Sequence, residues 1–205
     1  MTETLTAATP ELDVRARILS KTVQLLMGRG FTLLNMGDLA TDLGISKKTL
    51  YVHFETKHDL ALAVIDAFGA SLRKDIESVL ADPSLNFSDK LQGFMLGVIE
   101  RMSEVNPVAL EDLQRHAPVA YARIEEMRAI MIPYVFGRLL EQGMEEGVVR
   151  EEVNHALAID YHLHAIQGLL NPKTLARLKL SPGTAAQQAS RIFFRGVLNP
   201  SPAFP

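Results

Sequence analysis

The chain has no cysteine among its 205 residues, which excludes disulfide bonds and metal sites built on thiolates. It also has no apolar run close to the roughly 18 residues that read as a membrane span. Residues 1–10 have neither the basic start nor the apolar stretch of a signal peptide. Together these absences predict a cytoplasmic protein.

Catalytic signatures are missing as well: there is no strand-flanked Gly-x-Ser-x-Gly turn and no phosphate-binding glycine loop. His155, His162 and His164 raise the question of a metal site. On a helix, positions 155 and 162 share a face, but position 164 points away and no carboxylate completes a ligand set. We therefore expect that the protein is not an enzyme and that it binds no metal and no other cofactor. An enzyme on a helical scaffold is the rival interpretation, which turnover of a bound ligand would favour.

The net charge of −3 is unevenly distributed along the chain. Residues 1–57 contain seven Lys and Arg against six Asp and Glu, whereas residues 58–205 contain fourteen against eighteen. Because the N-terminal excess is small, binding to a polyanion would depend on a few well-placed cations rather than on a broad basic surface.

The segment 30–60 carries the strongest local signals in the chain. Asn35 is a favourable N-cap, and Asp38 stands three residues later, where a capping box has its acidic partner. Apolar residues then recur on one face as far as position 43. This pattern predicts a short helix over 36–43.

A turn and a second short helix follow directly. Gly44 stands where the turn needs a positive φ, which a residue with a β-carbon adopts only at a cost. Ser46 can cap a helix over 47–53, and the apolar Leu50 and Phe54 would face the core. Two short helices joined in this way form a helix-turn-helix.

The outward side of the second helix is polar and basic. Lysines, a hydroxyl, a phenol and an imidazole suit a DNA groove, because they neutralise phosphates and hydrogen-bond to base edges. We expect the first turn of this helix nearest the bases, and Tyr51, His53 and Lys57 mainly on phosphates. The candidate DNA-binding residues are Asn35, Ser46, Lys47, Lys48, Thr49, Tyr51, His53 and Lys57.

The same segment resembles the N-terminal signature of the tetracycline-repressor (TetR/AcrR) family of bacterial transcription regulators. An ordinary helical hairpin is the alternative, since Leu-Gly-Ile-Ser alone is a weak signal, but the combination of motifs is specific. From the helix at about Pro10 to Leu60, about a quarter of the chain, the match is carried by Gly30-Phe31, Asp38-Leu39-Ala40, Leu43-Gly44-Ile45-Ser46, Thr49-Leu50-Tyr51, His53-Phe54 and Lys57. The resemblance implies a DNA-binding dimer with a divergent helical ligand domain.

One position departs from the family pattern. Members of the family often have a polar or basic side chain at the position of Gly37, where it can reach a base. In this chain glycine cannot do so, and base reading is therefore expected to fall on the second helix. The operator cannot be inferred from relatives.

The rest of the chain is predicted to be helical, which makes the fold all-α. We expect a helix-turn-helix domain over 1–56, with 1–9 as a loose arm, a ligand-binding and dimerisation domain over 57–198, and a loose tail over 199–205. Apolar residues at four-residue spacing predict a long connecting helix over 57–80.

Capping residues and breakers predict the other helices. The first helix starts at Pro10 after a Thr9 cap. Ser88 and Thr184 are expected as caps, the stretch 172–183 as a linker, and Pro133 as a kink within its helix. The remaining predicted helices are 88–104, 107–116, 118–146, 151–170 and 184–198.

The last two long helices have apolar stripes with small residues, which suit a dimer interface. The resemblance also implies a dimer built from these two helices as a four-helix bundle. The alternative is that the stripes complete the core of the monomer. The stripes consist of Ala156, Ile159, Leu163, Ile166 and Leu170 on one helix and Ala185, Ala189, Ile192, Phe193 and Val197 on the other.

Methionines and aromatic residues in the body suggest an adaptable apolar pocket near Pro133. The alternative is that most of these side chains are ordinary core. Leu113 and Gln167 are further candidates. The predicted ligand-binding residues are Phe68, Phe94, Met95, Met102, His116, Tyr121, Met127, Met131, Tyr134 and His162.

The sequence is thus interpreted as a dimeric transcription regulator. The most favoured function is a repressor that leaves a palindromic operator of double-stranded DNA when a small hydrophobic effector enters its body. The alternative is a DNA-binding regulator without a small-molecule ligand, which is constitutive or controlled by a protein partner. A fully packed body would favour that alternative.

Overall fold

The structure is a computed structural model that describes residues 10–103 and 105–200. Within these ranges it is all-α, as predicted, with ten helices and no strand. The 1–9 arm, the Thr9 cap and the tail beyond residue 200 lie outside the described residues. The helices are α1 (Pro10–Arg29), α2 (Met36–Asp42), α3 (Lys47–His53), α4 (Lys57–Leu80), α5 (Phe87–Ser103), α6 (Pro107–His116), α7 (Pro118–Glu145), α8 (His155–Leu169), α9 (Pro172–Leu178) and α10 (Pro182–Val197).

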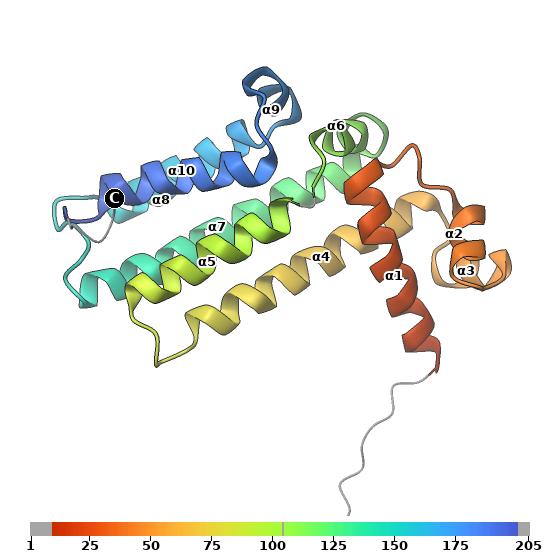
Figure 1. The fold of residues 1–205 in the computed structure, drawn as a ribbon, viewed down its shortest axis with the longest axis horizontal. Helices are drawn as coiled ribbons and strands as arrows, with labels where there is room; N and C mark the ends of the chain where they lie inside the picture. Colours follow the sequence, from red (N-terminus) through yellow and green to blue (C-terminus); the bar gives the residue numbers. More distant parts are fainter. Residues whose placement is uncertain (1–9, 104, 201–205) are drawn as a thin grey trace, which may run out of the picture.

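Helices α1, α2 and α3 gather at one end of the molecule (Figure 1). We call residues 10–56 the head and residues 57–200 the body. Ile18 of α1, Leu39 of α2 and Leu50 of α3 are fully buried against one another's helices and the start of α4. The guanidinium of Arg17 donates to the Leu43 carbonyl at 3.1 Å, which fastens α1 to the end of α2.

Helix α4 connects the two parts, as the four-residue spacing predicted. It begins with a capping box, in which the Thr56 N–H donates to Asp59 Oδ2 at 3.0 Å and the Asp59 N–H donates to Thr56 Oγ1 at 3.1 Å. Leu60 and Ile76 on its apolar stripe are buried, but Phe68 between them is only half-buried. The stripe therefore faces packed core at both ends of the helix and free space near its middle.

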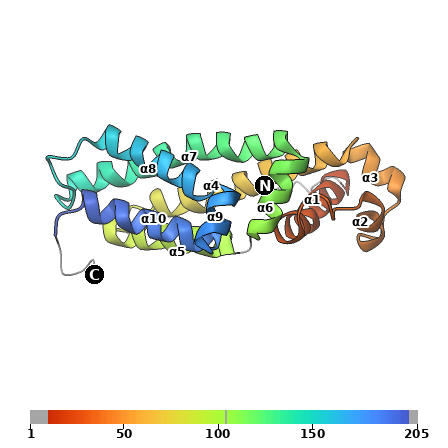
Figure 2. The same ribbon diagram turned by 90° about the horizontal axis from the view of Figure 1, so that it is seen from above.

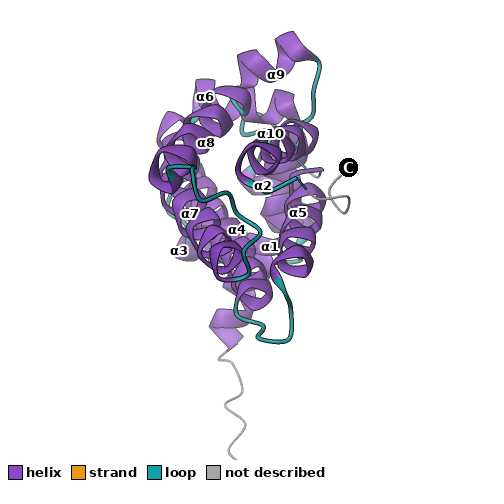
Figure 3. Cartoon of the chain, turned by 90° about the vertical axis from the view of Figure 1, so that its left-hand side faces the viewer, coloured by secondary structure: helices purple, strands orange, loops and turns teal. Residues whose placement is uncertain are grey.

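The body is a bundle in which α4, α5, α7, α8 and α10 run roughly along its length (Figures 1 and 2). Seen from the end far from the head, α8, α7 and α4 form one side and α10 and α5 the other (Figure 3). Helix α6 lies across the junction, where it packs on α1 and α7. None of the helices in the described ranges is long and apolar enough to cross a membrane.

Two apolar clusters hold these helices together. The near cluster includes Ile18, Leu50 and Leu60, and it continues without a break from the head into α6, α7, α8 and α10. The far cluster includes Phe87 and Phe194 and fills the other end of the body. Because the near cluster is shared, the head is docked on the body through its own core.

Several predicted helix starts were wrong for one reason, which is that a better cap stood nearby. Asn86 rather than Ser88 caps α5, since its side chain accepts from the Asp89 N–H at 3.0 Å. Asn154 caps α8, which begins at His155 rather than at position 151. Ser181 rather than Thr184 caps α10, with Pro182 at the first helical position.

The predicted linker over 172–183 contains α9. Asn171 caps this helix and Pro172 opens it, a combination that the sequence interpretation had taken as a stop signal only. Helix α7 continues through Pro133, and the kink predicted there stays a prediction. The predicted loose tail is fixed at its first residue, because the Asn199 N–H donates to the Val148 carbonyl at 2.9 Å.

Candidate functional site

The caps Asn35 and Ser46 and the turn at Gly44 have the predicted geometry, but the capping box predicted for α2 is present only in its Asn35 half. Asn35 Oδ1 accepts from the Gly37 N–H at 2.7 Å and from the Asp38 N–H at 3.2 Å. Gly44 has φ +66°, and Ser46 Oγ accepts from the Thr49 N–H at 3.0 Å. These local bonds fix where α3 starts and which side it presents.

The outward side of α3 is available to a partner. Lys47, Lys48 and Tyr51 are exposed, whereas Thr49 and His53 are half-buried. Leu50 points inward and is fully buried, and Phe54 is 3% exposed. The helix therefore has one face in the core and one polar face in solvent.

The glycine at position 37 has a structural consequence. A β-carbon there would lie 2.8 Å from Cε and 2.9 Å from Nζ of Lys47. The Lys47 side chain thus occupies the space in which a side chain at position 37 would stand. Its ammonium group lies beside the start of α2. The positive charge of this α3 residue therefore lies where the surfaces of the two helices meet.

Lys57 is less free than the sequence suggested. Its Nζ donates to the Thr32 carbonyl at 3.2 Å and lies 4.4 Å from the centre of the Phe31 ring. Burial lowers the pKa of Lys57, and the negative charge of Asp112 partly offsets this. Lys57 therefore ties α4 to the loop between α1 and α2, and its predicted phosphate contact stays a prediction.

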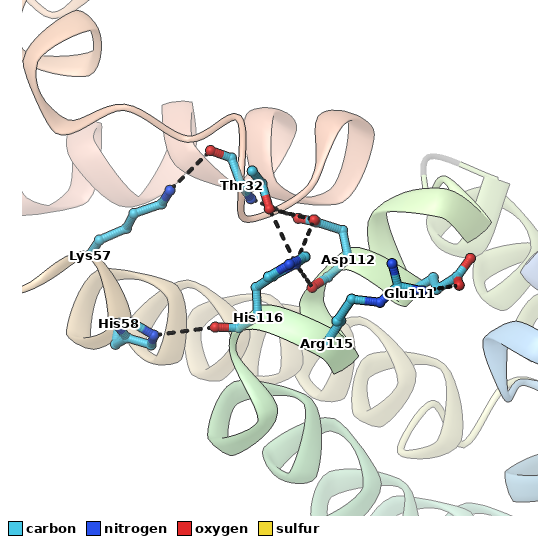
Figure 4. A network of polar contacts seen from close by, with 7 residues as sticks. All are labelled: Thr32, Lys57, His58, Glu111, Asp112, Arg115 and His116. Atoms are coloured by element: carbon cyan, nitrogen blue, oxygen red, sulfur yellow. Dashed lines mark hydrogen bonds and ion pairs between the residues drawn. The ribbon is translucent and has the colours of Figure 1, made fainter.

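A polar network joins that loop to α6 (Figure 4). Asp112 Oδ2 accepts from the Thr32 N–H at 2.7 Å. Its Oδ1 accepts from the Thr32 hydroxyl at 2.5 Å and lies 2.9 Å from Nδ1 of His116. Burial alone would raise the pKa of Asp112, but the hydrogen bonds from Thr32 and His116 outweigh it and lower the pKa. Gly30, with φ +95°, allows this approach, because a β-carbon there would lie 2.8 Å from Asp112 Oδ2.

The backbone reinforces this junction. The Asn106 N–H, just before α6, donates to the carbonyl of Met27 in α1 at 2.9 Å. Nε2 of His58, in α4, lies 3.4 Å from the His116 carbonyl (Figure 4). Helix α6 is thus bonded at both ends to elements of the head or of its connection to the body.

A cavity of about 170 Å³ lies in the body between the near and far clusters. Its walls are almost entirely apolar, and the helices that contribute to it include α1, α4, α5, α6, α7, α8 and α10. Six of the ten predicted ligand-binding residues line it: Phe68, Phe94, Met102, Met127, Met131 and His162.

The other four predicted pocket residues lie elsewhere. His116 belongs to the polar junction, and Tyr134 is exposed with the Arg73 guanidinium 5.6 Å from its ring centre. Met95 packs against the far cluster, and Tyr121 is buried in the near cluster, where burial raises its pKa. Leu113 is also core, and neither it nor Gln167 lines the cavity.

Sequence reasoning missed several wall residues, chief among them Met27, Phe136 and Arg128. Met27 lies near the end of α1, so the head itself contributes to the wall. Arg128 is the charged member of the lining, and its guanidinium lies 2.6 Å from Glu125 Oε1. A helical pattern marks such positions as inward-facing but does not tell a packed wall from an open one.

His162 is the unusual group in the cavity wall. It is 1% exposed, and its Nε2 has no hydrogen-bond partner. Its ring centre lies 4.2 Å from that of Phe136 and 4.7 Å from that of Phe193. Burial lowers the pKa of His162 to about 4, so the imidazole is neutral near pH 7. No group of three His, Cys, Asp or Glu in the described part of the chain could hold a metal ion.

The stripes predicted for dimerisation turn mainly into the monomer. Ile166 on α8 and Leu170 just after it are buried. On α10 the buried members are Ala185, Ala189, Phe193 and Val197. Phe193 packs against Phe136 and Phe194 in the far cluster. The large apolar side chains that these helices leave exposed are Leu157 and Tyr161, each 66% exposed, and Ile192, 68% exposed.

Comparisons with known proteins agree with this geometry. Residues 18–64 match the model of the bacterial regulatory proteins of the tetR family. The HTH-type transcriptional regulator YvaF of Bacillus subtilis is 26% identical over 185 residues, which cover 88% of this chain and 94% of YvaF. The HTH-type transcriptional repressor DhaR of a Mycobacterium species is 25% identical over 159 residues, 77% of this chain and 80% of DhaR.

Solved structures share the fold. The regulatory protein TetR of Rhodobacter sphaeroides superposes with a TM-score of 0.68 at 16% identity, over 90% of this chain and 98% of the other. A helix-turn-helix with an exposed polar face, on an all-α body, defines the class as a DNA-binding transcriptional regulator rather than an enzyme. Within that class, residues 18–64 match the tetR family of bacterial regulatory proteins, and most of the chain is similar to HTH-type transcriptional regulators.

Proposed function

We propose that this regulator is a homodimeric repressor that leaves a palindromic operator when a small hydrophobic ligand occupies the body. The observation that carries the ligand part is the apolar cavity of about 170 Å³ between the two clusters. A fully packed body would have favoured a regulator without a ligand. DhaR, described as a repressor, supports the direction of regulation.

The position of the cavity supports a route from ligand to DNA. Leu110 of α6 is part of its wall, and Asp112, two residues further along the same helix, holds Thr32 of the head. Met27 of α1 is also part of the wall, and its carbonyl accepts from Asn106. A ligand that moves α6 would therefore move the head. Switching occupancy from about 99% to 1% requires a preference of roughly 5.5 kcal/mol for the released state.

On the DNA side, we propose that Lys47, Lys48 and Thr49 lie nearest the bases. Lys47 gains importance because its side chain covers Gly37, so it substitutes for the missing side chain of α2. Tyr51, His53 and Lys57 would contact phosphates, and the caps Asn35 and Ser46 would present backbone N–H groups. One head reads only a few base pairs, and a two-fold dimer therefore matches an inverted repeat.

The dimer would form through α8 and α10. The exposed Leu157, Tyr161 and Ile192 lie on these helices, and burying them against a second copy would remove large apolar side chains from water. This assigns the interface to the outer faces of the two helices rather than to the stripes that complete the monomer.

Selection of bound duplexes from a random pool tests the DNA part of the proposal. Purified protein should enrich an inverted repeat whose half-sites are about one or more helical turns apart. Lys48→Ala should weaken binding to that duplex and lower the slope of log affinity against log salt by about one unit. Lys57→Ala should do the same if its ammonium leaves Thr32 for a phosphate.

The control variant is Lys74→Ala, because Lys74 is exposed on α4 in the body and should leave the slope unchanged. Enrichment of a single half-site without symmetry would contradict the palindromic operator. Unchanged affinity and slope for Lys57→Ala would assign that residue to the junction alone.

A further inference from the structure

Two buried side-chain nitrogen or oxygen atoms in residues 10–103 and 105–200 have no hydrogen-bond partner, and one of them is Nε2 of His162 in the cavity wall. Buried polar atoms in proteins are nearly always paired, because an unpaired one loses its bond to water without compensation. An unpaired nitrogen on a residue that lines free space therefore suggests a partner that enters that space.

The surroundings of His162 offer no such partner from the chain. Phe136 and Phe193 pack against the imidazole ring, and burial is the cause of its lowered pKa, with no charged neighbour contributing. Arg128 also lines the cavity, but its guanidinium is already paired with Glu125 at 2.6 Å. Apart from Arg128 and Ser190, the lining thus consists of apolar residues and of His162, which has a neutral, unpaired nitrogen, and it contains no uncompensated charge.

The size of the cavity limits the ligand. An engineered apolar cavity of about 150 Å³ in another protein holds benzene, and the cavity in this chain measures about 170 Å³. Phe68, Phe94 and Phe136 contribute aromatic walls, and Met102, Met127 and Met131 contribute flexible thioethers, which adapt to a flat ring and pack well against it.

We infer that the cavity takes an uncharged molecule of about one aromatic ring that carries a single hydroxyl group, with the hydroxyl bonded to Nε2 of His162. The inference rests on the proposed ligand-responsive function and names the chemical class of its ligand. A hydroxyl suits either tautomer of a neutral imidazole, because it both donates and accepts a hydrogen bond. A carboxylate fits less well, since it would have to separate Arg128 from Glu125.

Three probes of matched shape test the class: 4-ethylphenol, ethylbenzene and 4-ethylbenzoate. Their dissociation constants are measured by calorimetry with the full chain and without DNA, so that ligand binding and operator binding are scored separately. The decisive variant is His162→Phe, which keeps a ring at this position and removes the nitrogen. The control is Met102→Leu, which changes the wall at nearly constant volume.

We expect the preference for 4-ethylphenol over ethylbenzene, expressed as the ratio of their dissociation constants, to fall about tenfold in His162→Phe. Met102→Leu should change both constants alike. The nitrogen-15 signal of Nε2 in the wild type should shift with 4-ethylphenol but not with ethylbenzene, and this readout does not depend on the folding of any variant.

Two results would overturn the inference while leaving an apolar ligand site intact. One is an unchanged ratio of the two dissociation constants in His162→Phe, and the other is an Nε2 signal that does not shift with 4-ethylphenol. Tightest binding by 4-ethylbenzoate would overturn the class in favour of an acid held by Arg128. Failure of all three probes to bind would overturn the inference and count against ligand response. An operator selected by the same protein would still support DNA binding.

Discussion

The head and the body are both helical, but their functional side chains are held in different ways. In the head, bonds between residues two or three apart set where α2 and α3 begin, as with Asn35 for α2 and Ser46 for α3. In the body, the cavity exists only because seven helices from distant parts of the chain stop short of filling the space between two clusters. The proposed DNA-binding surface is thus fixed by local bonds, whereas the proposed ligand site depends on how distant helices pack.

The difference suits the two tasks. A surface that reads DNA needs its cations at fixed positions, whereas a sensor needs space whose filling changes the packing around it. The polar junction of Thr32, Asp112 and His116 lies between the two (Figure 4). The near cluster also crosses this boundary, which is why we propose that a change in the packing of the body reaches the head.

The largest effect is expected from charges on α10. Phe193→Glu buries an unpaired carboxylate in the far cluster and should destabilise the body by at least about 3 kcal/mol. Ile192→Glu, at the adjacent but 68% exposed position, should leave the monomer folded and abolish the dimer. Denaturant unfolding and sedimentation measure the two effects. Leu96→Glu, also at an exposed apolar position, is the control and should stay dimeric; an intact dimer for Ile192→Glu would assign the interface to another surface.

The next effect is a pH dependence that belongs to the body. Because burial lowers the pKa of His162 to about 4 from 6.5, the unfolded chain takes up a proton between these values and the folded chain does not. The free energy of unfolding should therefore fall by roughly 3 kcal/mol as the pH falls from 6.5 to 4. His162→Phe should remove this part of the pH dependence. Equal slopes for the two proteins across this range would contradict the burial of a neutral imidazole.

The smallest effect compares one glycine in each region. Gly44→Ala should lower the free energy of unfolding by about 1 kcal/mol, because φ at this position is +66°. No atom lies near enough to clash with the new β-carbon, so the backbone conformation is the cause. Gly97→Ala, inside α5 with equally open space, should instead stabilise by up to about 1 kcal/mol. Denaturant unfolding of both variants gives the two signs. If the two substitutions changed the free energy of unfolding in the same direction, backbone conformation would not determine their effects.

The predictability of the two regions differs for the same physical reason. The bounds of α3 and α4, and the start of α2, follow from caps and breakers, which act over two to four residues, and these were predicted within a residue. Asn106-Pro107 was correctly taken as a helix start, yet the same pair at Asn171-Pro172 was taken as a stop. Both pairs cap a helix and open it, so Asn followed by Pro marks a helix start at both places.

The body was harder because periodicity shows that a side chain is inward, not what it meets there. The stripe of α10 was correctly identified as apolar but assigned to a second copy, whereas Phe193 meets Phe136 and Phe194 of its own chain. Tyr134 was expected in the pocket and lies outside it, and Met27 was not expected and lines it. These outcomes depend on how helices pack, which no local pattern contains.

The central claim is that a ligand that binds in the cavity releases the protein from DNA through the body. The most direct measurement is the operator affinity of Met102→Trp, with and without one-ring apolar compounds that bind the wild type. We expect its affinity without ligand to equal that of the wild type, and we expect those compounds to release the wild type but not the variant, because the indole occupies the space. Loss of DNA binding in the ligand-free variant, with normal affinity for the compounds, would contradict the account.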